Sequence, residues 1–399
     1  MPKLYEVKIR LCSPTILTRR HRRNIFEVLT KPLNIPSRSI KGALIDSLAR
    51  EISIKYGIKK ASCLSNRGKR EECDALIDEI INPLLRIRPA YPVIDGKEAE
   101  PASPFVYVKK IKETGEESLF VGITVDELTS IISIDEIAKS IPPVREGYPK
   151  SLHGELVILH NRKIKKVDIY TSRHESTAIN KKYYTAEKGM LFSYELLPAG
   201  LEFTTTIFDP ADLLGRLMDK LNTGDKLEIF LGRGRSRGFG RAIMELKEKE
   251  IERKIDERAK EIARSSVYVL KALSPTLEII DGQNSRPYIE NIKYPPQDLK
   301  NHVSTIQEAE LNIRKVQTNE GKVPFVMGSL TKISGWGTSS NGSGPIPRYY
   351  AGAPGSIHVY EVHSPDPEQA LVFIELTGLD ELSSIGFNWF KVVTTKEVI

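Results

Sequence analysis

Two stretches far apart in this chain read alike, and they constrain its fold more than any other feature. Residues 4–17 read LYEVKIRLCSPTIL and residues 267–279 read VYVLKALSPTLEI. Both alternate apolar and polar residues and are rich in β-branched and aromatic side chains, which is typical of strands. Each runs into Ser-Pro-Thr, where the proline ends the strand. The match predicts that one structural unit is used twice.

The ends of the two halves also match. The first half closes with a turn at 197–200, the strand LEFTTTIF, a helix-like stretch from Asp209, the strand KLEIFLG and a glycine loop. Asp209 before Pro210 is a candidate helix N-cap. The second half closes with a turn at 352–355, the strand SIHVYEV, a segment from Pro367, the strand VFIEL and Gly386. This order predicts an α+β protein of two tandem ferredoxin-like (RRM-like) domains, each with an antiparallel sheet covered on one face.

The stretch from 245 to 266 separates the halves. It has no Pro or Gly, and opposite charges recur at three- and four-residue spacing, which favours a solvent-exposed helix. We therefore predict a first domain over 1–246, a charged linker helix over 247–266 and a second domain over 267–399. The first half is too long for one ferredoxin-like unit, so residues 61–175 are interpreted as an insertion, a kind of segment that often carries binding surface.

Composition excludes several classes of protein. A chain of 399 residues favours two domains. No apolar run approaches the ~18 residues of a membrane span, and the N-terminus lacks the apolar core of a signal peptide. Three cysteines favour a reducing, cytoplasmic location over a disulfide framework. Lys and Arg exceed Asp and Glu by 59 − 52 = 7. Part of this excess is clustered, as in Arg19, Arg20, Arg22 and Arg23, and clustered cations indicate phosphate recognition.

The strongest motif is LGRGRSRGFGR at 231–241. Its glycines, Gly232, Gly234, Gly238 and Gly240, permit positive φ and close approach of a ligand to the backbone. Exposed N–H groups in such a loop form concavities that bind anions. Arginines at alternate positions add forked donors that match phosphate oxygens. The loop lacks the Gly-Lys-Ser/Thr ending of a P-loop and the glycine spacing of a dinucleotide fingerprint.

A second motif reads NIPSRSIKGAL at 34–44, a turn that leads into an amphipathic helix. Ser37 and Ser39 are candidate caps for that helix. Arg38 and Lys41 lie at its positive end, where phosphates bind readily.

Together these motifs resemble the RAMP superfamily of CRISPR-associated proteins. In the second half, Gly335-Trp336-Gly337, the stretch from Pro345 to Arg348 and Ala353-Pro354-Gly355-Ser356 are similar to tandem-domain RAMPs, most of all the large type III-D subunit. The resemblance spans most of the chain, with little contribution from 61–175. One departure is that the second domain ends Gly-Phe-Asn-Trp, without the arginines of the first loop, which argues against phosphate binding there.

The resemblance implies a non-catalytic subunit of a type III effector complex, without metal or cofactor. Such subunits hold the five-prime tag of a CRISPR RNA and contact other RAMP subunits and the large signalling subunit, away from membranes. The residues expected to bind RNA are Arg19, Arg20, Arg22, Arg23, Ser37, Arg38, Ser39, Lys41, Gly232, Arg233, Gly234, Arg235, Ser236, Arg237, Gly238, Phe239, Trp336 and Arg348. Aromatic side chains, including Tyr183 and Tyr184, are candidates to stack on unpaired bases.

Other functions stay open from the sequence. A metal-independent ribonuclease that processes CRISPR RNA would use a histidine, and His21 or His174, the latter near Lys181 and Tyr183, is a candidate. A backbone RAMP that cleaves target RNA would use an aspartate such as Asp46 or Asp95. A protein-protein adaptor would bind no RNA. Cys63 and Cys73 do not match the spacing of a standard zinc finger, so we expect no metal there.

Overall fold

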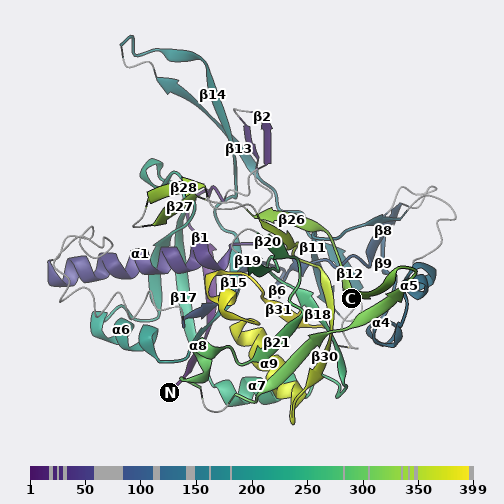
Figure 1. Ribbon diagram of the computed structural model, residues 1–399. Coiled ribbons are helices and arrows are strands. Elements are labelled where there is room, and N and C mark those ends of the chain that lie inside the picture. Colours follow the sequence, from purple (N-terminus) through teal and green to yellow (C-terminus); the bar gives the residue numbers. More distant parts are fainter. Residues whose placement is uncertain are drawn as a thin grey trace. The chain divides into compact units, whose positions relative to one another are not determined.

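The computed structural model describes residues 1–17, 21–24, 27–29, 34–57, 84–110, 117–140, 149–160, 163–179, 182–281, 284–303, 306–333, 336–339, 342–345 and 349–394. These residues form a sheet-rich protein of mixed α and β structure (Figure 1). They divide into two compact units, which we treat separately. The first unit comprises Lys3–Glu98 and Asp168–Lys249, and the second comprises Ala99–Val167 and Glu250–Ile399.

The first unit is built on a seven-stranded sheet. In spatial order its strands are β16 (Lys226–Phe230), β17 (Arg241–Lys249), β1 (Lys3–Leu11), β15 (Glu202–Asp209), β5 (Tyr91–Ile94) and β6 (Lys97–Glu98), with β4 (Arg86–Ile87) also on β15. The strand β1 lies between β15 and β17 and is antiparallel to both. The N-terminal strand of the sequence is therefore central in this sheet.

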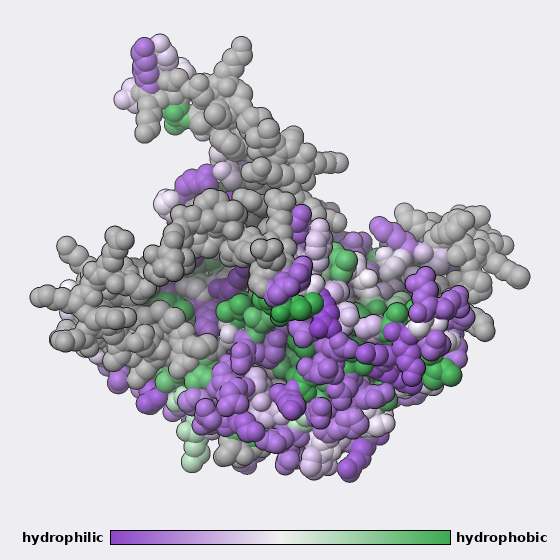
Figure 2. All heavy atoms as spheres, in the orientation of Figure 1, coloured by the Kyte–Doolittle hydropathy of each residue, from purple (hydrophilic) through white to green (hydrophobic). Residues whose placement is uncertain are grey.

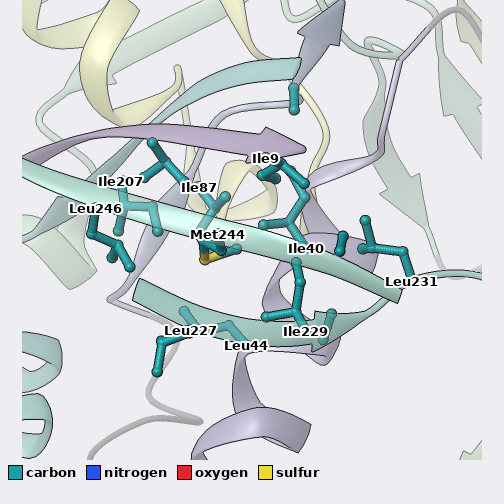
Figure 3. Close-up of a cluster of buried hydrophobic side chains, with 14 of the residues drawn as sticks. Ile9, Ile40, Leu44, Ile87, Ile207, Leu227, Ile229, Leu231, Met244 and Leu246 are labelled. Carbon is teal, nitrogen blue, oxygen red and sulfur yellow. The ribbon is translucent and has the colours of Figure 1, made fainter. Parts of the chain in front are cut away.

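Two helices of the first unit, α1 (Ser37–Tyr56) and α6 (Leu213–Leu221), supply much of its core. Alternate residues of β1, such as Val7 and Ile9, are fully buried in that core because successive side chains of a strand point to opposite faces. Figure 3 shows Ile40 and Leu44 of α1 pointing toward Ile229 of β16. The amphipathic helix that the sequence predicts after residue 36 is confirmed as α1.

A four-stranded sheet completes the first unit. In spatial order its strands are β13 (Ser172–Ile179), β14 (Ala186–Leu196), β3 (Glu27–Leu29) and β2 (His21–Asn24). The long hairpin of β13 and β14 therefore pairs with β3, and β3 pairs in turn with β2, which contains Arg22 and Arg23.

The second unit contains a six-stranded sheet. In spatial order its strands are β21 (Asn291–Tyr294), β22 (Ala309–Ile313), β30 (Ile357–His363), β18 (Val267–Ala272) and β31 (Phe390–Val392), with β25 (Val326–Met327) also on β30. As in the first unit, the strand that ends in Ser-Pro-Thr lies between two antiparallel neighbours. Its helices are α4 (Val125–Ser130), α5 (Ile134–Ser140), α7 (Ile251–Ala259), α8 (Gln297–Lys300), α9 (Pro367–Thr377) and the 3₁₀ turn η2 (Glu381–Ile385).

The second unit also contains shorter strands. Those from the inserted stretch are β7 (Glu100–Pro101), β8 (Val106–Lys110), β9 (Glu117–Val121), β10 (Lys150–Ser151), β11 (Leu156–His160) and β12 (Lys163–Lys166). The hairpin pairs are β19 (Glu278–Asp281) with β20 (Asn284–Arg286), β23 (Lys315–Thr318) with β24 (Gly321–Pro324), β26 (Leu330–Ile333) with β29 (Tyr349–Gly352), and β27 (Trp336–Ser339) with β28 (Gly342–Pro345).

The repeated Ser-Pro-Thr segments make matching hydrogen bonds. Thr15 exchanges two backbone hydrogen bonds with Leu197, and Thr276 does the same with Gly352. The proline carbonyl and the serine hydroxyl of each segment also accept matching bonds. These are Gly240 N–H to Pro14 O, Asn388 N–H to Pro275 O, Arg241 N–H to Ser13 Oγ and Trp389 N–H to Ser274 Oγ. The two segments that read alike in the sequence therefore make equivalent hydrogen bonds in the structure.

Three local predictions were wrong. The segment VFIEL is not a strand, because it lies inside α9, which starts at an Asp366 N-cap followed by Pro367. Asp209 is the last residue of β15 and not an N-cap, although its carboxylate accepts the N–H groups of Leu213 and Leu214 at 2.9 and 2.7 Å. The linker helix is shorter than expected, because residues 247–249 belong to β17 and α7 begins at Ile251.

The linker helix is also less exposed than its charges suggest. Ile255 is 5% exposed, and Arg258 makes a bidentate pair with Glu375 of α9 at 3.0 and 2.9 Å. One face of α7 is thus packed within the second unit. The sequence predicts that the stretch 61–175 is an insertion in the first domain. In the structure, residues 99–167 of this stretch pack with the second unit.

A buried carboxylate joins the inserted stretch to the sheet of the second unit. Glu100 of β7 accepts from Lys271 of β18 at 2.9 Å and from Lys391 of β31 at 3.1 Å. Burial opposes its ionisation, but the two ammonium groups outweigh burial and hold the pKa of Glu100 well below its ordinary value. The ion cluster therefore fixes β7 against two strands that are distant in sequence.

Hydrophilic residues cover most of the described surface on the face drawn in Figure 2, with small apolar patches between them. No helix among the described residues is both long and apolar enough to cross a lipid bilayer.

Candidate nucleic-acid interface

The glycine–arginine loop, residues 232–241, connects β16 to β17 and folds back on the segment after β1. Arg233 N–H donates to Ile16 O at 3.1 Å, and Gly240 N–H donates to Pro14 O at 3.0 Å. Gly232 and Gly240 have φ of +72° and +83°. A Cβ on either would lie 2.1 Å or less from a backbone oxygen, of Ile16 or of Leu231 respectively. Only glycine fits these two positions, because both the dihedral angle and the space forbid a side chain.

The backbone of this loop is less open than the sequence predicts. A 3₁₀ turn, η1 (Arg235–Arg237), occupies its centre. Five of the loop N–H groups donate to backbone carbonyls, those of Arg233, Arg237, Gly238, Phe239 and Gly240. These five groups are not available to an anion. The arginine side chains are therefore the main donors that the loop presents.

The three central arginines are all exposed, and they have different neighbours. Arg235 lies 3.5 Å from a carboxylate oxygen of Asp46 on α1. Arg237 stacks over the rings of Tyr194 and Phe239, at 5.1 and 5.8 Å from their centroids. Arg233 lines a cleft beside α1. Arg241, at the end of the loop, pairs with Glu228 of β16.

The start of α1 faces this loop. Its N-cap is Pro36, and no side chain caps the helix, so the prediction that Ser37 or Ser39 is the cap was wrong. Ser37 is 2% exposed and its hydroxyl points into the unit. Arg38 is exposed, and it lines the cleft together with Ser39.

We name this cleft of the first unit the basic cleft. Its volume is about 420 Å³, and its lining residues are Arg38, Ser39, Gly42, Ile45, Asp46, Gly232, Arg233 and Arg235. Three guanidinium groups face one carboxylate, so the cleft carries an excess of positive charge. The proximity of the two sequence motifs, which are distant along the chain, is the main result that folding adds to them.

Lys41 does not join this cleft. Its ammonium group donates to the Leu85 carbonyl at 3.2 Å. Burial, with a contribution from the charge of Arg86, lowers the pKa of Lys41 to about 8. The sequence places Lys41 one turn from Arg38, but the helix directs it toward the interior of the unit.

Aromatic side chains lie beside the glycine–arginine loop. His174 of β13 meets Phe239 edge to face with a centroid distance of 5.4 Å, and it is paired in register with Tyr194 of β14. Arg237 joins the same group through its stacking on Tyr194. Tyr194 was not predicted from the sequence to belong to the site, because nothing near it in the chain marks it as a neighbour of the loop.

Comparison with known families decides what kind of protein this is. The model of the RAMP superfamily matches residues 8–243, more than half of the chain. The chain belongs to the RAMP superfamily. The matched region includes both the start of α1 and the glycine–arginine loop, so the basic cleft lies inside the part that carries the RAMP signature.

Solved structures resemble this RAMP protein at low sequence identity. A chain in the cryo-EM structure of type III-B Cmr-beta bound to cognate target RNA and AMPPnP is 15% identical with a TM-score of 0.45, and 98% of this chain and 97% of that chain are covered. The CRISPR-associated protein Cas6 is 9% identical with a TM-score of 0.33, covering 98% and 100%. Cmr4 (Cas7) of Pyrococcus furiosus is 13% identical with a TM-score of 0.25, covering 61% and 99%. No protein of curated function matches.

The structure describes the other candidate residues to different extents. Arg19, Arg20, Lys181, Arg348, Cys63 and Cys73 lie outside the described residues. Arg22, Arg23 and His21 lie in β2 and Trp336 in β27, but only the backbone of these strands is described. Tyr183 and Tyr184 are exposed, at 64% and 86%, between β13 and β14. Asp95 lies in the turn between β5 and β6 with φ of 53°.

Proposed function

We propose that this RAMP superfamily protein is a non-catalytic RNA-binding subunit of a type III CRISPR effector complex. It holds the five-prime tag of the CRISPR RNA and contacts other RAMP subunits and the large signalling subunit, in the cytoplasm. The observation that supports the proposal most is the basic cleft, which is lined by Arg38, Arg233 and Arg235 together.

Several features of the cleft favour a sugar-phosphate strand. Guanidinium groups donate in a planar fork that matches phosphate oxygens and stay charged at any physiological pH. The cleft opens beside the first turn of a twenty-residue helix, whose backbone dipole adds positive potential. The neighbouring rings of Phe239 and Tyr194 suit the stacking of an unpaired base. Phosphate contacts and stacking together are typical of single-strand recognition.

We further propose that each unit is a ferredoxin-like domain, with the boundary near the 247–266 linker. The strand order β17, β1, β15, β5 supports this for the first unit, because the first strand of the chain lies between the third and the last. The order β31, β18, β30, β22 supports it for the second. In both units a helix connects the third strand with the strands that follow, α6 in one and α9 in the other.

The direct test removes one arginine from each wall of the basic cleft. In the Arg38→Ala/Arg233→Ala variant we expect the affinity of the full chain for labelled CRISPR RNA to fall about tenfold, with a shallower dependence on salt, because two phosphate contacts are lost. The measurement is fluorescence anisotropy at several salt concentrations. The matched control is Arg253→Ala/Arg264→Ala, which removes the same charge from two exposed residues of the second unit.

An equal loss in both variants would mean that only net charge attracts the RNA, and the cleft would have no role. The same reactions, run without metal and analysed on a denaturing gel, address catalysis. Cleavage of the RNA that His174→Ala abolishes would replace the non-catalytic proposal with a processing ribonuclease.

A second prediction concerns the carboxylate in the basic cleft. Asp46 pairs with Arg235 at 3.5 Å and would lie near the phosphates of a bound strand. Asp46→Asn should raise RNA affinity roughly two- to fivefold, because it removes a negative charge and releases Arg235. Asp219→Asn, which changes an exposed acid of α6 outside the cleft, is the control and should have a smaller effect in the same anisotropy assay. Unchanged or weaker binding by Asp46→Asn would contradict a phosphate at this position.

A further inference from the structure

The second unit contains a cleft in the position that corresponds to the basic cleft. The bonds from Gly240 to Pro14 and from Asn388 to Pro275 align the two loops residue by residue. The helix whose start lines each cleft has a proline as its N-cap, and the two prolines have nearly the same conformation. Pro36 has φ −60° and ψ 141°, and Pro296 has φ −62° and ψ 153°. The start of α8 and residues 379–382 line a cleft of about 850 Å³.

The charge of this second cleft is opposite to that of the first. When residues are counted back from the equivalent positions Gly240 and Asn388, Arg233 corresponds to Glu381. In the same way Arg235 corresponds to Ser383. Five carboxylates line the cleft, those of Glu278, Glu308, Glu310, Asp380 and Glu381. They outnumber Lys293 and Lys300, and the ammonium group of Lys300 lies 2.6 Å from Glu308. We name it the acidic cleft. Its charge repels phosphate, so this cleft is unsuited to a second RNA strand.

Apolar side chains form much of the remaining wall. Ile279 is 43% exposed and lines the cleft together with Ile289, Ile292 and Leu382. An apolar wall bordered by carboxylates is compatible with a protein partner, because protein interfaces combine an apolar centre with a polar rim. A small cation alone would leave this apolar wall in contact with water.

We propose that the acidic cleft binds a segment of a neighbouring protein subunit in which Lys or Arg alternates with apolar residues. The apolar side chains of the segment cover Ile279 and Leu382, and its cations face Glu310 and Glu381. The volume accommodates several side chains, since clefts of this size hold whole ligands. The proposal concerns the second unit, so it stands or falls independently of RNA binding by the basic cleft.

The test uses the full chain and short fluorescein-labelled peptides. One peptide contains Lys and Leu at strand spacing, a second contains Lys and Leu at helix spacing, and the reference peptides carry Glu in place of Lys. We expect at least one Lys-Leu peptide to bind saturably and both Glu-Leu peptides to bind at least about tenfold more weakly. Glu310→Lys/Glu381→Lys should weaken the Lys-Leu peptide by about tenfold or more. Glu252→Lys/Glu320→Lys, which changes net charge equally at exposed residues elsewhere in the second unit, should retain most of the affinity.

Three results would overturn the proposal. The first is the absence of saturable binding by either Lys-Leu peptide. The second is equal loss of peptide affinity in the two charge-reversal variants. The third is a fall in RNA affinity in Lys293→Ala/Lys300→Ala that exceeds the fall in Arg253→Ala/Arg264→Ala, because RNA would then occupy the cleft. Thermal unfolding of each variant verifies that the second unit is folded, and the peptide assay contains no RNA, so failure of RNA binding leaves this result unaffected.

Discussion

Changing Arg233, Arg235 and Arg237 together to alanine is expected to weaken RNA binding by the full chain about a hundredfold at moderate salt. Each lost phosphate contact contributes roughly tenfold or somewhat less to affinity, and each also releases counterions from the RNA. The slope of log affinity against log salt should become shallower by about 2, because three contacts on a single strand each contribute about 0.7. The prediction rests on the proposed function.

A triple lysine variant is the informative comparison. Lysine keeps the charge but lacks the planar fork, and it loses the stacking of Arg237 on Tyr194 and Phe239. Its affinity should fall between those of the wild type and the alanine variant, with a salt slope close to wild type. All three side chains are exposed, so neither variant should change the unfolding temperature appreciably. If the alanine variant kept wild-type affinity and salt slope, the loop would have no part in RNA binding.

Replacing Glu100 with alanine should lower the free energy of unfolding by about 3–5 kcal/mol, because Lys271 would be left charged in the interior. Lys271 has 3% of its side chain exposed, and its ammonium group lies 2.9 Å from the Glu100 carboxylate. Lys391 retains 28% exposure and can turn toward water. The loss is measured by chemical denaturation at neutral pH. Replacing both partners, as in Glu100→Leu/Lys271→Met, should restore most of the stability, since it leaves no unpaired buried charge.

The same carboxylate gives stability a dependence on pH. Its pKa in the folded protein is lower than in the unfolded chain, where a glutamate titrates near 4.3. Its contribution is therefore complete above that unfolded value and declines as the pH falls toward the folded pKa. Wild type should lose stability on acidification below about pH 5 more steeply than Glu100→Leu/Lys271→Met. Equal slopes for the two proteins, or a cost below about 1 kcal/mol for Glu100→Ala, would contradict the importance of this ion cluster.

Local sequence patterns predicted the local structure well. The two strands that run into Ser-Pro-Thr, the helix after Pro36 and the positive φ of the loop glycines all form as expected, because strand alternation, helical periodicity and glycine conformation depend on neighbouring residues. The run VFIEL was misread, because a short apolar run fits a buried helix and a buried strand equally. Its identity depended on burial on several sides, which no local pattern reports.

Long-range packing decided the rest. Sequence alone predicted Arg38, Arg233 and Arg235 as phosphate donors, but only the tertiary structure brought these three residues into one cleft and directed Lys41 to the Leu85 carbonyl instead. It also placed Tyr194 beside Arg237, and it joined residues 99–167 to the second unit through Glu100. These outcomes depend on which surfaces complement each other in three dimensions. The neighbours of each residue in the sequence largely determine whether it lies in a strand, a helix or a turn. The partners of a buried charge or of an exposed arginine are determined by the packing of the whole unit.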